Sequence, residues 1–211
     1  PVALCIFTRR LTVLPFRSKK RIHTGPNHFV NVASNINFAL TCHKKQIMQL
    51  IEVIDKKSRK QFHQVPHLIY RNDPNWACPL EGMVEDTFNP GKNKAFKNGK
   101  AIRWVLVGEN GELLGRIAAF VNGNTAHTYE QPTGSCGFFE CVDNQEAANL
   151  LFNAGAGWNK QNGMEAMDGP VNFGENYVNW GLLVKGFMPQ GYGMPYNPPY
   201  YEKLFRTFGF E

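Results

Sequence analysis

The sequence predicts a mixed α/β domain in which helices accompany a central sheet. Two segments carry this prediction: residues 136–170 have the pattern strand, helix, strand, and residues 102–121 have the pattern of a hairpin. A strand–helix–strand unit usually returns to its own sheet by a right-handed crossover, so its strands are expected to share that sheet. The 211 residues suffice for one domain with a substantial core.

The central unit begins with a short apolar run, CGFFECV at residues 136–142, that has strand composition. Asp143 is expected to cap the following helix, with Glu146 completing a capping box three residues later. Apolar residues then recur at three- and four-residue steps as far as Trp158, and Gly163 ends the helix. Residues 164–167 are expected to form the returning strand.

The hairpin consists of Ile102–Val107 and Leu113–Val121, which flank Asn110 and Gly111. Both of these turn residues tolerate positive φ, so the pattern is typical of a tight hairpin connection.

Other elements are expected before and after this core. Residues 48–55 are typical of a strand, and residues 56–65 of a short helix ended by Pro66. The segment from 171 to 197 is rich in Gly, Pro, Asn and aromatic residues and favours a long shaped loop. A last helix is expected after Pro198 and Pro199, with Gly209 at its end; its apolar side comprises Tyr201, Leu204, Phe205 and Phe208.

The net charge of +6 is unevenly distributed along the chain. Residues 1–47 hold eight of the 23 Lys and Arg residues and no acid, which leaves 15 basic and 17 acidic residues, a net charge of −2, in residues 48–211. We expect residues 1–47 to be an extension outside the domain, either disordered or translated upstream of a native start at Met48. A basic arm for an acidic partner such as a nucleic acid is the alternative. The domain at 48–211 has no excess of basic residues, so no nucleic-acid partner is expected for it.

Cysteine and histidine spacing and hydropathy indicate which redox state, metal sites and membrane contacts to expect. The five cysteines are scattered and never form CxxC, which favours reduced thiols in a cytoplasmic protein. Cys136 and Cys141 differ in parity along their strand and are expected to face opposite sides of the sheet. His63 and His67 are four apart, but Pro66 between them argues against a helical metal pair, so no metal is expected. No apolar run reaches the roughly 18–20 residues of a membrane helix, so no membrane partner is expected either.

Several phrases from Met48 to the end resemble one known superfamily. They are YRNDPNW, LGRIAAF, GFFE, MDGPVN, GLLVKGF and MPYNPPYY. Together with the element order, they resemble an uncharacterised bacterial branch of the GNAT superfamily of acyl-CoA-dependent N-acyltransferases. The resemblance implies an α+β fold with a mixed, mostly antiparallel central sheet flanked by helices, and further strands beyond Glu211. It also implies acetyl-CoA or another acyl-CoA as donor and an amine or other small molecule as acceptor. The alternative is a non-catalytic protein of this fold that binds a small molecule or a partner. Nothing in the sequence predicts the oligomeric state.

In this superfamily a Q/R-x-x-G-x-G/A loop at the central strand-to-helix junction holds the pyrophosphate of coenzyme A through backbone N–H groups and the helix dipole. The matching stretch here, CVDNQEAAN, has no glycine, and Asp143 and Glu146 would repel a phosphate. The positions at which the resemblance implies cofactor contacts are Val142, Asn144, Gln145 and Ala147.

The resemblance also implies catalytic positions. Glu140 on the central strand is the candidate general base for an amine, with an ordinary solvent-facing carboxylate as the alternative. Superfamily members often place a proton-donating tyrosine in Y-x-x-x-G-F, where this chain has Phe205 in FRTFGF. Tyr201, one turn earlier, could take that role or simply pack. The candidate substrate-binding residues, for which a structural lid is the alternative, are Glu175, Asn176, Tyr196 and Asn197.

Overall fold

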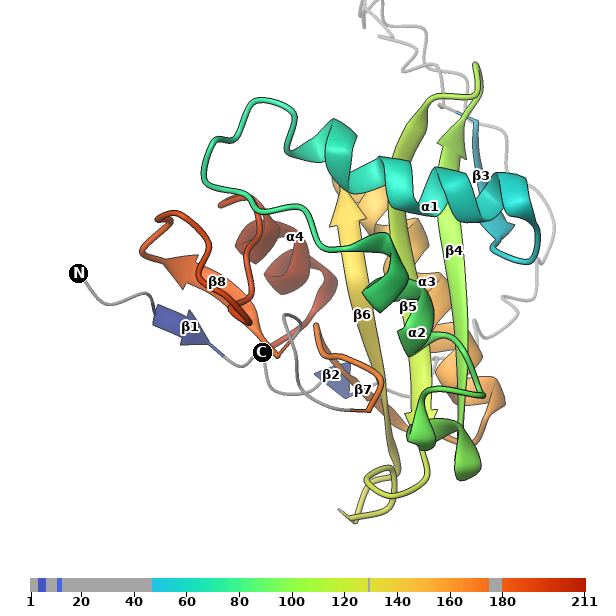
Figure 1. The fold of residues 1–211 in the computed structure, drawn as a ribbon. Coiled ribbons are helices and arrows are strands. Elements are labelled where there is room, and N and C mark those ends of the chain that lie inside the picture. Colours follow the sequence, from blue (N-terminus) through green and yellow to red (C-terminus); the bar gives the residue numbers. More distant parts are fainter. Residues whose placement is uncertain (1–3, 7–10, 13–46, 129, 175–179) are drawn as a thin grey trace, which may run out of the picture.

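The computed structural model of the chain describes residues 4–6, 11–12, 47–128, 130–174 and 180–211 (Figure 1). The predicted substrate residues Glu175 and Asn176 lie outside these residues.

A six-stranded mixed sheet forms the centre of the domain, with strand order β2-β7-β6-β5-β4-β3. The β6–β7 pair is parallel and the remaining neighbours are antiparallel, as expected for a mostly antiparallel sheet. β8 lies outside this sheet and pairs with β1. The strands are β1 (Leu4–Ile6), β2 (Leu11–Thr12), β3 (Met48–Glu52), β4 (Gly99–Gly108), β5 (Leu113–Asn122), β6 (Thr133–Cys141), β7 (Ala166–Asp168) and β8 (Leu182–Lys185).

Helices cover both faces of the sheet (Figure 1). α1 and α2 lie on one face over a core that includes Phe62, Val84 and Phe120. α3 lies on the other face, where α4 joins it in a second core. Because each face is covered, strands β4 to β6 are apolar on both sides. The helices are α1 (Lys56–Ile69), α2 (Glu81–Thr87), α3 (Gln145–Gln161), α4 (Tyr201–Phe208) and the 3₁₀ helix η1 (Lys94–Lys97).

The predicted core elements are confirmed. The hairpin is β4–β5, and Gly111 in its turn has φ +83°. The unit β6–α3–β7 is the expected crossover, with its two strands paired in parallel. α4 buries Tyr201, Leu204 and Phe205, and Gly209 ends it in the left-handed region.

Several local predictions were wrong. α1 continues through Pro66 to Ile69. The Phe62 carbonyl, which Pro66 leaves without a helical N–H partner, accepts a hydrogen bond from Arg116 instead. α3 is capped by Asn144, whose side chain accepts the Ala147 N–H at 3.0 Å, and not by Asp143. β8 lies in the segment expected to be a loop, and no element was predicted for α2 or η1. Each is short, and the N-cap of α2 makes no side-chain hydrogen bond.

A β-bulge in β6 overturns the expected orientation of the two cysteines. Arg116 pairs with Glu140 and Ala118 with Gly137, so two residues of β6 oppose Ile117. Phe138 lies in this bulge with φ 51°. Among the described residues other than glycine, it is the one that has a positive φ. The extra residue shifts the alternation by one, so Cys136 and Cys141 both enter the core under α3.

Two short strands come from the first 47 residues, and they pair with β7 and β8. That residues 1–47 lie outside the domain stays a prediction. None of the described helices combines the length and apolar content that a membrane crossing demands.

Candidate functional site

A cavity of about 290 Å³ opens on the α1–α2 side of the sheet. Its apolar wall comes from the 76–80 segment, α2 and Phe138, and residues of the 190–196 segment, which bonds to Ala77 through Gln190, also line it. Two charged side chains, Arg116 and Glu140, also line it, and we call it the main cavity. A volume near 300 Å³ with an apolar wall and few polar groups is typical of a small-molecule site.

Glu140 is held in this cavity by three other side chains. Its carboxylate oxygen Oε2 accepts hydrogen bonds from the hydroxyls of Tyr70 at 2.9 Å and Tyr201 at 2.8 Å. Its Oε1 lies 3.7 Å from the Nη2 of Arg116, and the side chain is 13% exposed. Burial raises the pKa of Glu140 above its ordinary value, while the charge of Arg116 and the two tyrosine hydrogen bonds oppose part of that rise.

Tyr201 connects the carboxylate to the backbone of β6. Its hydroxyl donates to Glu140 and accepts the Cys141 N–H at 2.8 Å. The neighbouring Tyr200 donates to the Cys141 carbonyl at 2.7 Å. β7 pairs with β6 only at residues 133–135, so these hydroxyls supply the partners that a longer β7 would give. Burial, and then the charge of Glu140, raises the pKa of Tyr201 well above its ordinary value, so this hydroxyl stays protonated.

Arg116 is the cross-strand partner of Glu140 and is 3% exposed. Its Nη1 donates to the carbonyl of Phe62 at 2.9 Å, and its guanidinium lies 4.6 Å from the centre of the Phe62 ring. Its Nε has no hydrogen-bond partner among the residues that the structure describes. Burial lowers the pKa of Arg116 and the charge of Glu140 opposes this, which leaves a paired, charged floor to the cavity.

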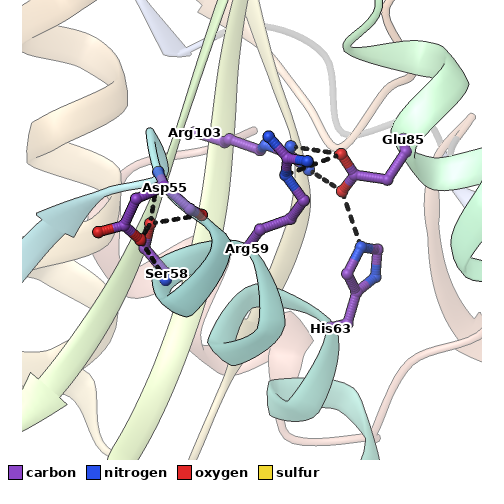
Figure 2. Close-up of polar contacts among 6 residues, drawn as sticks. All are labelled: Asp55, Ser58, Arg59, His63, Glu85 and Arg103. Atoms are coloured by element: carbon purple, nitrogen blue, oxygen red, sulfur yellow. Dashed lines mark hydrogen bonds and ion pairs between the residues drawn. The ribbon is translucent and has the colours of Figure 1, made fainter.

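A second charged cluster, centred on Glu85 of α2, fixes the cavity wall (Figure 2). Arg103 of β4 donates to both oxygens of Glu85, at 2.7 and 2.8 Å, and His63 of α1 lies 2.7 Å from Oε1. Arg59 adds a contact of 3.4 Å, and the Arg103 guanidinium lies 4.3 Å from the centre of the Phe88 ring. The cluster ties α2, which carries wall residues of the main cavity, to α1 and β4.

The N-terminus of α3 does not fit the pyrophosphate of coenzyme A. The Asn144 side chain already accepts a hydrogen bond from the Ala147 N–H, so this N–H is not available to a phosphate. The Gln145 side-chain amide donates to Asn149 and to the carbonyl of Leu204. Asp143 and Glu146 are exposed beside this turn and add negative charge. Of the four predicted cofactor-binding residues, Ala147 is buried and Val142 packs against the core under α3.

The two predicted substrate residues within the described part of the chain differ in position. Tyr196 lines the main cavity, and its hydroxyl donates to Asp73 at 2.7 Å. Asn197 is buried and bonds both the N–H and the carbonyl of Leu183, so it holds β8 in place. Burial and Asp73 raise the pKa of Tyr196 to about 12.

His63 and His67 do not meet. His63 points to Glu85, whereas His67 lies 3.6 Å from the thiol of Cys78. In the part of the chain that the structure describes, no three His, Cys, Asp or Glu residues come together as a metal site.

The structure thus brings together the two predicted catalytic residues, Glu140 and Tyr201. Sequence reasoning missed Arg116 and the role of Tyr70. The signal for Arg116 was available: an arginine inside the apolar run LLGRIAAFV must be buried, and buried arginines need a partner. Nothing local indicated that Tyr70, 70 residues before Glu140, would reach it.

Comparison with known proteins shows similarity over part of the chain. No protein-family model matches the chain. The chain is 29% identical over 163 residues to Protein YghO from Escherichia coli strain K12; the match covers 74% of this chain and spans 40% of the length of that relative. A solved structure of a proposed acetyl transferase from Pyrococcus furiosus shares 14% identity over 56% of this chain and 78% of that one, with a TM-score of 0.36.

Proposed function

We propose that this domain binds an amine-bearing small molecule in the main cavity, with Glu140 as the group that holds its nitrogen and accepts its proton. The observation that carries the proposal is a largely buried carboxylate of raised pKa that lines the cavity. A carboxylate made more basic by burial is suited to proton transfer near neutral pH. Arg116 and two tyrosine hydroxyls orient it and keep it able to bear charge.

The reaction that this arrangement would serve is transfer of an acyl group to that nitrogen. The sequence resemblance to N-acyltransferases supports it, and a positioned base for the amine is what such a transfer needs. In this scheme Glu140 removes a proton from the ammonium, and the nitrogen lone pair attacks the acyl carbon of a thioester donor. The C–S bond then breaks, and the thiol leaves with the second proton of the amine. Tyr201 is a positioning residue, because its one proton is already donated to Glu140.

The acyl donor is a separate question. Because the α3 N-terminus does not fit a pyrophosphate, we assign no step to coenzyme A. The same observation favours a second candidate, in which the domain binds its small molecule and transfers nothing.

One assay separates the two candidates. Purified protein is mixed with acetyl-CoA and a panel of primary amines, and free thiol is followed by reaction with a chromogenic disulfide. Acyl transfer predicts thiol release that requires both protein and amine and falls at least 100-fold in Glu140→Gln, which keeps the size of the side chain but not its basicity. The same comparison in Glu202→Gln, an exposed acid on α4 away from the cavity, should show no change.

If no amine supports thiol release, acyl transfer from acetyl-CoA is refuted, and the proposal that remains to be tested is amine binding at Glu140. That remaining proposal is tested by calorimetry with the same amines. Failure of every amine to bind, or undiminished binding to Glu140→Gln, would refute it.

A further inference from the structure

The proposed function uses Arg116 only to orient Glu140, through a contact of 3.7 Å, and leaves most of the arginine's donors without a role. Arg116 is almost completely buried and lines the same cavity. Of its donors, only Nη1 makes a hydrogen bond of ordinary length, to the Phe62 carbonyl. Nε has no partner among the described residues, and the 3.7 Å contact of Nη2 with Glu140 is too long for a hydrogen bond.

A buried guanidinium with unused donors is costly. An unsatisfied buried polar group destabilises a fold, and more so when the group is charged. Nη2 has only the long contact with Glu140, so it can donate to a carboxylate oxygen of a ligand in the cavity. The cavity therefore offers an anion-binding group at its floor.

Glu140 has one oxygen atom that can still accept a hydrogen bond. Both tyrosine hydroxyls bond to Oε2, so Oε1 has only the long contact with Arg116. A donor nitrogen can approach this oxygen while an acceptor oxygen approaches Arg116. Because the two residues are direct cross-strand partners, the two ligand groups must be close together on one molecule.

The rest of the wall is apolar. Val84 and Phe138 line its inner part, and Leu80 and Met83 line it while remaining 69% and 42% exposed. A ligand with one charged end and an apolar body would cover these side chains and bury its own apolar surface.

We infer that the main cavity recognises an α-amino acid with an apolar side chain, its carboxylate on Arg116 and its ammonium on Glu140. This inference rests on the proposed function for the ammonium and adds the carboxylate and the apolar body.

A matched ligand series tests it on the intact chain. Calorimetry is run with L-phenylalanine, with 2-phenylethylamine, which lacks the carboxylate, and with 3-phenylpropanoate, which lacks the amine. L-Phenylalanine should bind at least tenfold more tightly than either analogue, because each analogue lacks the group that binds one of the two charged side chains.

A variant links the preference to the arginine. Arg116→Lys keeps a positive charge beside Glu140 but loses the Nη2 donor, because an ammonium group lacks the rigid, planar arrangement of guanidinium donors. It should reduce the preference for L-phenylalanine over 2-phenylethylamine at least fivefold. Met83→Ala is the control: it should weaken all three probes alike and leave the preference unchanged. Circular dichroism reports whether each variant is folded, and if Arg116→Lys is not, the ligand series on the native chain decides.

The outcomes are distinct. If 2-phenylethylamine binds as tightly as L-phenylalanine, this inference is overturned and the amine site on Glu140 stands. If 3-phenylpropanoate binds as tightly, the amine site and the proposed function fail. If no probe binds at 10 mM, this inference is overturned, while the panel of amines still judges the proposed function.

Discussion

Replacing Tyr201 by phenylalanine removes one oxygen atom from the centre of the candidate site. That hydroxyl donates to Glu140 and accepts the Cys141 N–H, both at 2.8 Å, and its side chain is fully buried. A hydrogen bond to a charged group contributes about 1.5–3 kcal/mol, and a buried N–H left without a partner costs about 1–3 kcal/mol. Allowing for some relaxation, we expect Tyr201→Phe to lower the free energy of unfolding by about 3–4 kcal/mol.

The adjacent tyrosine is a matched control. Tyr200→Phe deletes the same atom from the same helix end, and its hydroxyl also bonds Cys141, at the carbonyl. Tyr200 is only half-buried, so water can replace the lost donor, and the expected cost is about 1 kcal/mol. Urea denaturation at pH 7 measures both values. In a chain of this size a difference of about 2–3 kcal/mol corresponds to roughly 4–12 °C in melting temperature.

The pH dependence of the Tyr201→Phe penalty is a second readout. The Tyr201 hydroxyl stabilises the charged form of Glu140, whose folded pKa is raised by burial. The penalty should therefore be largest above that folded pKa and shrink as the pH falls through it, because a neutral carboxyl group depends less on the donor. Equal costs for the two variants, or a Tyr201→Phe penalty that does not vary with pH, would refute the role assigned to this hydroxyl.

Three further changes test the surrounding fold by denaturation. Glu85→Gln should cost about 2 kcal/mol, because it leaves Arg103 buried beside a neutral partner while the partial exposure of Glu85 limits the loss. Burial tends to raise the pKa of Glu85, but its contacts with Arg103 and His63 outweigh burial and lower it. The difference in unfolding free energy between Glu85→Gln and wild type should therefore be complete above pH 4.5 and diminish as the pH falls below it. A difference that grows in acid would contradict the pairing. Gly115→Ala should destabilise by about 2–3 kcal/mol, because its Cβ would lie 2.5 Å from the Glu140 carbonyl oxygen; full stability would show that β5 and β6 can separate there. Gly157→Ala on the exposed side of α3 meets nothing within 4 Å and should stabilise by about 0.5–1 kcal/mol, and a loss of stability would contradict the helical environment.

Long periodic elements were predictable from the sequence because their signal is repeated over many residues. The α3 stripe, the β4–β5 hairpin and the α4 helix before Gly209 all appear where expected. Boundaries failed where two neighbouring residues could serve equally well. Asp143 and Asn144 are residue types that cap helices about equally well, and the structure uses Asn144.

Elements that depend on tertiary contacts were missed. α2 is seven residues long without a side-chain cap, so Glu85 and its contacts with β4 and α1 supply much of what holds it. β8 has four residues, with Asn197 bonding its backbone. Neither the ion pairs nor the Asn197 bridge can be inferred from the local sequence.

The candidate site itself depends on the β-bulge in β6, which the sequence pattern does not predict. With regular alternation from Cys136, Glu140 would point into the apolar core under α3, where a carboxylate would have no cationic partner on β5. The bulge at Phe138 rotates Glu140 to the other face and places it opposite Arg116. A non-glycine residue at φ 51° carries strain, and such strain persists only where the surroundings enforce it. Here Phe138 packs against Phe62 and Phe120, so the aromatic core under α1 holds the bulge, and the bulge in turn aims the carboxylate at the cavity.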